Sequence, residues 1–289
     1  MAAVVGVRAF AARAAEQPRN FIWKVARPGG GATSGAVYVV GSIHLLTSDY
    51  YPLSPALDAA FKDSDLLVEE ADLGELTAPE SQMKLLTRGM LPAGQSVETV
   101  VSPATYALVA QRAAALGLPV EPLRRFKPWM LALTLVELEW QRAGFDASLG
   151  LDRHFYDRAK ADGRPVRGLE TVDFQLSLFD DMTPAQQDMM LAGSLKNVDA
   201  ERANLLSLTT AWKAGDARTV ERLVLEDVSD NPTMYRRLLI DRNRSWLPAI
   251  EALFARAGHA FVVVGAAHLV GPDGLIALLH AKGYAVTQL

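Results

Sequence analysis

FVVVGAAHLVGPDG, at residues 261–274, joins four consecutive apolar residues to a glycine, two alanines and His268. Such a run predicts a buried strand that delivers a histidine to its carboxyl end, beside residues small enough for a tight turn. An earlier segment, VYVVGSIH at residues 37–44, has the same arrangement and ends in His44. Because the chain has only five histidines, two strand-Gly-x-x-His segments predict one site to which both ends of the chain contribute.

Composition limits the classes of protein that this chain can belong to. With 289 residues, half of them apolar, it is long enough to bury a large core. Its net charge of −4 and the lack of a clustered basic segment argue against nucleic acid as a partner. The absence of cysteine excludes thiol nucleophiles, thiolate metal sites and disulfides. No segment is apolar over a length that would span a bilayer.

The first 17 residues, MAAVVGVRAFAARAAEQ, resemble a short secretory leader with an A-x-A-like cleavage site. We therefore expect a periplasmic or secreted protein, with a cytoplasmic location as the alternative. Residues 18–289 are expected to form a single domain.

The two ends of the chain are predicted to build one sheet. Residues 21–27 and 37–40 are expected to form a β-hairpin, and a helix over 54–62 then leads to a buried strand over 65–72. This β-α-β unit should hold its outer strands parallel, with His44 at the end of one and Glu70 at the end of the other. Near the other end of the chain, the pattern predicts a strand over 259–264, a helix over 271–281 and a last strand over 284–289.

The middle of the chain, residues 78–257, is predicted to be a helical insertion that covers this sheet. Its expected helices begin at a proline, a leucine or an aspartate and cover residues 79–89, 103–116, 128–142, 151–162, 184–195, 199–214, 216–226 and 232–256. One short strand over 164–168 interrupts them. The predicted fold class is therefore α/β, with a mixed central sheet made of two β-α-β-like halves and a large helical insertion.

Several polar residues outside the two histidine segments could join the site. Glu69 and Glu70 end a buried strand, and only one of them can face the site because strand side chains alternate. Glu170 follows the strand over 164–168 in the same way. Asp152 opens a helix and is interpreted as its cap. Arg242 lies in a long helix, where an inward-facing guanidinium could bind an anionic group.

Histidine and carboxylate side chains without cysteine suit Zn²⁺, Mn²⁺ or Co²⁺, each of which would lower the pKa of a bound water. A histidine paired with a carboxylate can also activate water with no metal. The spacing of the residues does not choose between these two chemistries.

Five segments together resemble one protein family. They are VYVVGSIH at 37–44, LLVEEADL at 66–73, GLDRHFYDRAKADGRPVRGLET at 150–171, DRNRSW at 241–246 and VVVGAAHLVGPDGL at 262–275. The chain resembles the TraB/GumN (TraB/PrgY/GumN) family, which is itself similar to the Tiki metalloproteases and, more distantly, to the erythromycin-esterase and ChaN-like fold.

This resemblance implies that His44, Glu70 and His268 are the active-site residues. Glu70 is preferred to Glu69 because it stands two residues before an aspartate, as in the Tiki-like pattern. The resemblance also implies that Glu170, His154, Arg242 and Asn243 line the site.

We therefore expect a hydrolase, in the first instance a peptidase-like enzyme dependent on a divalent metal such as Mn²⁺, Co²⁺ or Zn²⁺. The expected metal ligands are His44, Glu70, His154 and His268. Glu170 or Glu70 would take the proton from a bound water, and Arg242 or Asn243 would stabilise the oxyanion. The alternatives are a metal-independent esterase-like hydrolase and a non-catalytic protein that binds a peptide, haem or a metal. The substrate would be a peptide or a small molecule.

Overall fold

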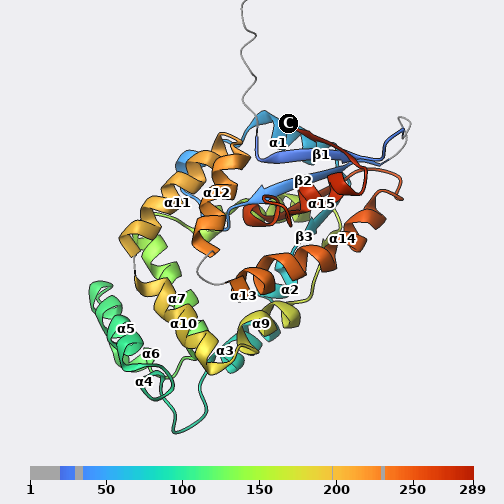
Figure 1. Ribbon diagram of the computed structural model, residues 1–289. Coiled ribbons are helices and arrows are strands. Elements are labelled where there is room, and N and C mark those ends of the chain that lie inside the picture. The colour runs from blue at the N-terminus through green and yellow to red at the C-terminus, as the bar shows by residue number, and fades with distance from the viewer. Residues whose placement is uncertain (1–19, 30–34, 197, 229–231) are drawn as a thin grey trace, which may run out of the picture.

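The computed structural model describes residues 20–29, 35–196, 198–228 and 232–289. The expected leader at residues 1–17 lies outside these ranges, so that expectation stays a prediction. Within them the chain forms a mixed α/β fold, as the sequence predicts, with a single six-stranded sheet surrounded by helices (Figure 1).

The sheet is built from both ends of the chain. Its strands are β1 (Ile22–Ala26), β2 (Val37–Ser42), β3 (Leu66–Glu69), β4 (Val166–Gly168), β5 (Ala260–Gly265) and β6 (Ala285–Gln288), in the spatial order β4-β3-β5-β2-β1-β6. The four strands β4, β3, β5 and β2 run parallel, and β1 is antiparallel to both β2 and β6. The central strands β2, β3 and β5 are buried along their whole length, as the apolar runs predict.

Strand β5 lies between β2 and β3 and pairs with both. Val39 and Val68 share Val262 as their register partner. The predicted β-α-β unit of β2, α1 (Pro55–Lys62) and β3 is therefore present, but its two strands are separated by a strand from the far end of the chain. This insertion places the carboxyl ends of β2, β5 and β3 next to one another at one edge of the sheet.

The middle of the chain divides into two groups of helices. The first group packs on the sheet and shares its core; it contains α8 (Leu151–Ala161), α11 (Val198–Lys213), α12 (Ala217–Val228) and α14 (Asp241–Leu253). Two helices from outside the middle of the chain, α1 and α15 (Leu275–Ala281), pack on the sheet in the same way. The second group lies to one side of the strands and has cores of its own; it contains α3 (Pro79–Gly89), α5 (Pro103–Ala115), α7 (Pro128–Arg142), α9 (Val172–Asp180) and α10 (Pro184–Lys196) (Figure 1). The expected cover over the sheet is thus supplied by part of the insertion.

The helical segment predicted over 232–256 is present over residues 232–253, although it is not one regular α-helix. The chain instead forms α13 (Pro232–Tyr235), a π-helical turn η3 (Arg236–Ile240) and then α14. A π turn inserts one extra residue and so rotates the residues that follow it about the helix axis. After this turn Arg242 and Asn243 are buried, whereas the neighbouring Arg244 side chain is 59% exposed.

The remaining helices are short: α2 (Leu73–Thr77), α4 (Val97–Val100) and α6 (Val120–Leu123), with 3-10 turns over Ser48–Tyr50, Ala147–Leu149 and Ala266–His268. In the part of the chain that the structure describes, every helix is too short or too polar to cross a membrane.

Candidate functional site

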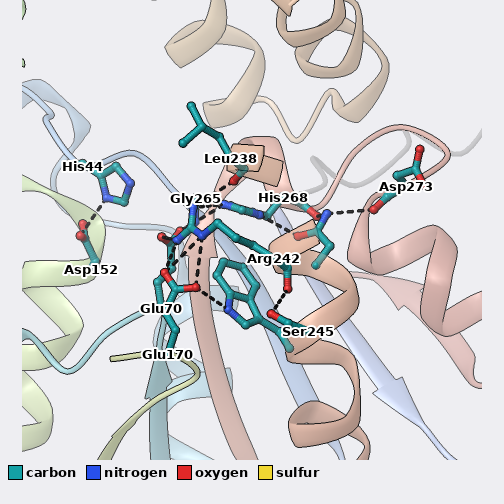
Figure 2. A network of polar contacts seen from close by, with 12 residues as sticks. His44, Glu70, Asp152, Glu170, Leu238, Arg242, Ser245, Gly265, His268 and Asp273 are labelled. Carbon is teal, nitrogen blue, oxygen red and sulfur yellow. Dashed lines mark hydrogen bonds and ion pairs between the residues drawn. The ribbon is translucent and has the colours of Figure 1, made fainter. Parts of the chain in front are cut away.

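The three residues placed first by the sequence lie together where β2, β3 and β5 end. Glu70 directly follows β3, His44 lies two residues after β2, and His268 closes the 3-10 turn after β5 (Figure 2). A β-carbon added at Gly265 would lie 3.3 Å from Glu70 Oε1, 3.6 Å from His44 Nε2 and 3.6 Å from His268 Cδ2. The three side chains therefore converge on one small space that Gly265 leaves open.

Arg242 lies at the centre of the polar network and is only 7% exposed. Its guanidinium donates from Nε to both carboxylate oxygens of Glu170, each at 3.2 Å, and from Nη2 to Glu170 Oε1 at 2.6 Å and to Glu70 Oε2 at 2.5 Å. Nη1 donates to the carbonyl oxygen of Leu238 at 3.1 Å and to His268 Nε2 at 3.0 Å. All five N–H groups of the guanidinium are thus used within the protein.

The network fixes the tautomer of His268. Asn243 Nδ2 donates to the carbonyl oxygens of His268 and Asp273, at 3.2 and 2.8 Å, so the Oδ1 atom of Asn243 faces the histidine ring as an acceptor. The Nδ1–H of His268 donates to that oxygen at 2.7 Å, which leaves the Nε2 lone pair for Arg242. Burial, with Arg242 alongside, lowers the pKa of His268 to about 3. His268 is therefore a neutral, buried residue that holds Arg242 in place.

Glu70 and Glu170 both form ion pairs with Arg242. The backbone places them together, because the Glu170 N–H donates to the carbonyl oxygen of Glu70 at 2.8 Å. Burial by itself raises the pKa of Glu70, but the positive groups around it and the Gly265 N–H, which donates to Oε1 at 2.7 Å, outweigh burial and lower the pKa to about 2. Trp246 Nε1 donates to Glu170 Oε2 at 2.8 Å. Arg242 thus lies between the two carboxyl groups and forms an ion pair with each.

His44 differs from the other members of the site because its side chain is 56% exposed. Its Nδ1 atom lies 2.9 Å from Asp152 Oδ2, so this nitrogen carries a proton and Nε2 faces the space over Gly265. Asp152 raises the pKa of His44 above its ordinary value of 6.5, and the exposure of the ring to water weakens this effect. His44 is the residue of the site that can exchange protons with a bound molecule.

Local backbone packing brings Asp152 to His44. The Leu151 N–H donates to the carbonyl oxygen of Ile43 at 3.1 Å, which joins the start of α8 to the turn after β2. A β-carbon at Gly150 would lie 2.2 Å from the carbonyl oxygen of His44, so only glycine permits this approach. The same approach places Asp152, in the first turn of α8, against the imidazole.

His154 is not brought together with the other predicted ligands. It lies two residues after Asp152 in α8 and so points away from that face of the helix. Its ring packs against Tyr51 and Phe155, with centroids 5.2 Å apart in each pair. Burial lowers the pKa of His154. Its position is that of a partly buried packing residue beside the site.

The arrangement does not fit the metal site predicted from the sequence. In the ranges that the structure describes, no group of three or more histidine and carboxylate side chains is arranged to hold a metal ion. The reason lies in Arg242, whose guanidinium bonds the atoms that were expected to bind a metal: His268 Nε2 and Glu70 Oε2. We assign no metal ligand in this structure.

Two residues of the site were missed by sequence reasoning. Asp152 was interpreted as a helix cap, although Gly150, two residues before it, was a signal that this helix starts against another backbone segment. Trp246 gave no signal beyond its place four residues after Arg242, where i, i+4 neighbours share a helix face. The structure places the guanidinium of Arg242 4.6 Å from the Trp246 ring centroid, and the ring 4.5 Å from that of His268.

Comparison with known proteins gives a family but no established activity. The family described as TraB/PrgY/gumN matches residues 21–288 of this chain. That match bears out this part of the resemblance, whereas similarity to the Tiki proteins and to the ChaN-like fold stays an expectation. No solved structure matches the chain.

The relatives carry names that state no function. "Uncharacterized protein YbaP" of Escherichia coli (strain K12) is 25% identical over 242 residues, which cover 84% of this chain and 87% of the relative. The protein of the same name from Shigella flexneri matches equally well. An uncharacterized protein of Treponema pallidum (strain Nichols) is 21% identical over 279 residues, covering 91% of this chain and 81% of the relative.

Proposed function

Since the chain belongs to the TraB/PrgY/gumN family, we propose that it is a hydrolase in which His44 activates water for attack on an ester or peptide bond. One observation carries this proposal: His44 Nε2 and Glu70 Oε1 face the same space over Gly265, while Nδ1 of His44 is held by Asp152. A base oriented by a carboxylate on its far side is the arrangement that general-base catalysis requires.

In the proposed reaction a water molecule lies over Gly265, between His44 and Glu70. His44 Nε2 accepts a proton from the water as the water oxygen bonds to the substrate carbonyl carbon, and the carbonyl π electrons move onto the carbonyl oxygen. That oxygen then reforms the carbonyl bond, the bond to the leaving alcohol or amine breaks, and the leaving group takes the proton from Nε2. The products are a carboxylic acid and an alcohol or amine, and His44 returns to its neutral form.

Glu70 serves this step through its charge. Its carboxylate raises the pKa of His44 alongside the larger effect of Asp152, so it favours the imidazolium that forms as water gives up its proton. Arg242 and the Gly265 N–H hold the two oxygens of Glu70 in place. The oxyanion role expected for Arg242 stays a prediction, and it would require the guanidinium to give up one of its present bonds.

The metal-dependent peptidase expected from the resemblance also stays a prediction. It would need Arg242 to leave His268 and Glu70 before a metal could bind them. A metal-independent hydrolase needs no such rearrangement, and it is therefore the reading that the geometry favours.

The direct test of this proposal is a substitution that fills the space over Gly265. Gly265→Ala places a methyl group 3.3 Å from Glu70 Oε1, closer than most side-chain contacts, and directly where the water is proposed to lie. We expect kcat/KM for p-nitrophenyl esters or fluorogenic peptides to fall by about 100-fold, because small displacements at a reacting centre have effects of this size. Gly193→Ala in α10 is the matched control, since a β-carbon there meets no atom within 4 Å.

The assay also separates the alternatives. Full turnover by Gly265→Ala would contradict the proposed position of the water. A wild-type protein that binds haem, a peptide or Mn²⁺ but cleaves neither substrate series would favour the non-catalytic binding protein.

A further inference from the structure

Arg237, in the π turn η3, is a charged residue that the proposed reaction does not use. It is half-buried, whereas Arg236 beside it is exposed. Arg237 Nε donates to the carbonyl oxygen of Leu178 at 2.6 Å, and Nη2 donates to that of Ser177, also at 2.6 Å. The guanidinium therefore binds the last turn of α9.

The end of α9 accepts these two bonds for a physical reason. The last four carbonyl groups of a helix have no N–H partner within the helix. The Met182 N–H, which would continue the helical pattern to Leu178, donates to Phe179 instead at 3.3 Å. A cation is also favoured at the negative end of the helix dipole. Arg237 supplies both the donors and the charge.

The start of α9 is bound to the same helical segment through a second arginine. Glu170 directly precedes Thr171, the N-cap of α9, and accepts from Nε and Nη2 of Arg242. Nη1 of Arg242 donates to the carbonyl oxygen of Leu238, the residue after Arg237 (Figure 2). These links close a ring that runs from Glu170 along α9 to Arg237 and returns through Arg242.

Helix α9 is a firm side of this ring because its apolar face is buried. Val172 and Leu176 form a core with Trp129 of α7. The nine residues of α9 make it about 13 Å long. The two arginines therefore bind two points whose separation the helix fixes.

The π turn allows both arginines to reach the segment 170–178 together. In a regular α-helix, residues five apart point about 140° away from each other. In η3 the Asp241 N–H donates to the carbonyl oxygen of Arg236, five residues earlier, so the turn holds one extra residue. Arg237 and Arg242 then lie near the same side of the helix, as residues four apart do in a regular helix.

We propose that Arg237 is a positioning residue that maintains the π turn and thereby directs Arg242 to its two carboxylate partners. Without the bonds from Arg237 to α9, η3 is free to become regular helix, which turns neighbouring residues by about 100° relative to one another. Arg242 Nη2 would then leave Glu70, whose charge favours the imidazolium of His44 in the proposed reaction. The effect on turnover rests on the proposed function, whereas the effect on Arg242 does not.

NMR of the intact, substrate-free chain tests the position of Arg242 through Trp246. The indole Nε1–H of Trp246 donates to Glu170 Oε2 at 2.8 Å, so its ¹H–¹⁵N signal reports the state of the pair that Arg242 and Glu170 form. In Arg237→Ala we expect this signal to move upfield, because the hydrogen bond weakens as its geometry is lost. The indole signal of Trp212, whose N–H bonds the backbone near the end of β2, should stay in place.

Arg112→Ala is the matched control for loss of an arginine at a helix end. Arg112 is also half-buried, and its Nε atom donates to the carbonyl oxygen of Leu195 at 3.1 Å, in the last turn of α10. It belongs to the same group of helices as α9 but lies outside the ring. We expect the Trp246 signal to keep its wild-type position in this variant.

Turnover gives a second readout. Arg237→Ala should lower kcat by about 10- to 100-fold and leave KM unchanged, because a displaced charge near the reacting centre acts on the chemical step. Arg237→Lys keeps the positive charge without the planar fork of donors. It should lie between the wild type and Arg237→Ala in both readouts, and it serves in place of Arg237→Ala if the alanine variant does not fold.

The outcomes separate this proposal from the proposed function. A Trp246 signal that stays in place in every folded Arg237 variant, or that moves equally in Arg112→Ala, would overturn the proposal. A signal that moves while kcat stays unchanged would support the role of Arg237 in placing Arg242, and it would count against the catalytic role of Glu70 instead.

Discussion

The two strand-Gly-x-x-His turns of this protein look alike in sequence and differ in almost every physical property. The side chain of His44 is 56% exposed, whereas that of His268 is 4% exposed. His44 Nδ1 faces a carboxylate, Asp152, and His268 Nδ1 faces a neutral amide, Asn243. The carboxylate raises the pKa of the first histidine, and burial lowers that of the second. A shared motif therefore brings two histidines to one site, but their neighbours give them different tasks.

The cause of the difference is the element that packs on each turn. The start of α8 packs on the turn after β2 and places the carboxylate of Asp152 beside His44. Helix α14 covers the turn after β5 and encloses its histidine between Arg242, Asn243 and Trp246. The first histidine can meet a substrate, and the second supports the residues that surround it.

The largest expected effect is that of His44→Ala on turnover. Loss of the general base should lower kcat by about 10²–10⁴-fold, while the free energy of unfolding changes by no more than about 0.5 kcal/mol because the side chain is exposed. Steady-state kinetics and urea unfolding on the same preparation measure both. Unchanged turnover would remove His44 from the role of base.

His268→Ala should reverse this pattern by acting mainly on stability. It leaves Arg242 Nη1 and Asn243 Oδ1 buried without their partner, which should lower the free energy of unfolding by roughly 1–3 kcal/mol before the loss of packing is added. Urea unfolding should show a lower midpoint with an unchanged slope. A variant as stable as the wild type would mean that His268 does not hold this network.

The pH dependence of turnover should reflect the titration of His44 and not that of His268. The base must be neutral, and Asp152 raises its pKa, so activity should fall as pH falls through a value above 6.5. In Asp152→Asn the midpoint should move down toward 6.5, since the charge that raises the pKa is gone. A pH–rate profile of kcat/KM from pH 5 to 10 measures the midpoint, and one that stays in place in the variant would contradict the pairing.

The smallest expected effect is that of a chelator. Because Arg242 already bonds the predicted metal-binding atoms of His268 and Glu70, we expect EDTA treatment to leave kcat/KM unchanged. Metal analysis of protein purified without chelator provides the independent check. Activity that is lost with EDTA and restored by Mn²⁺, Co²⁺ or Zn²⁺ would instead support the metal-dependent peptidase.

Sequence patterns anticipated most of the secondary structure, because apolar runs and helix-starting prolines act locally. They located β2, β3 and β5, and the proline starts of α3, α5, α7 and α10. They did not locate the π turn before α14, which has no local signature. The interpretation of Asp152 as a helix cap failed for the same reason, since its partner lies 108 residues away.

The sequence by itself determined that two histidines and a glutamate follow buried strands, since four apolar residues before a glycine form a strand wherever the chain places it. Only the tertiary structure decided which of these residues contact one another and how each affects the charge of the others. Strand β5 enters between β2 and β3, and Arg242 arrives from a helix 172 residues beyond Glu70. Protonation and charge depend on burial and on neighbouring groups, and both are properties of the folded chain.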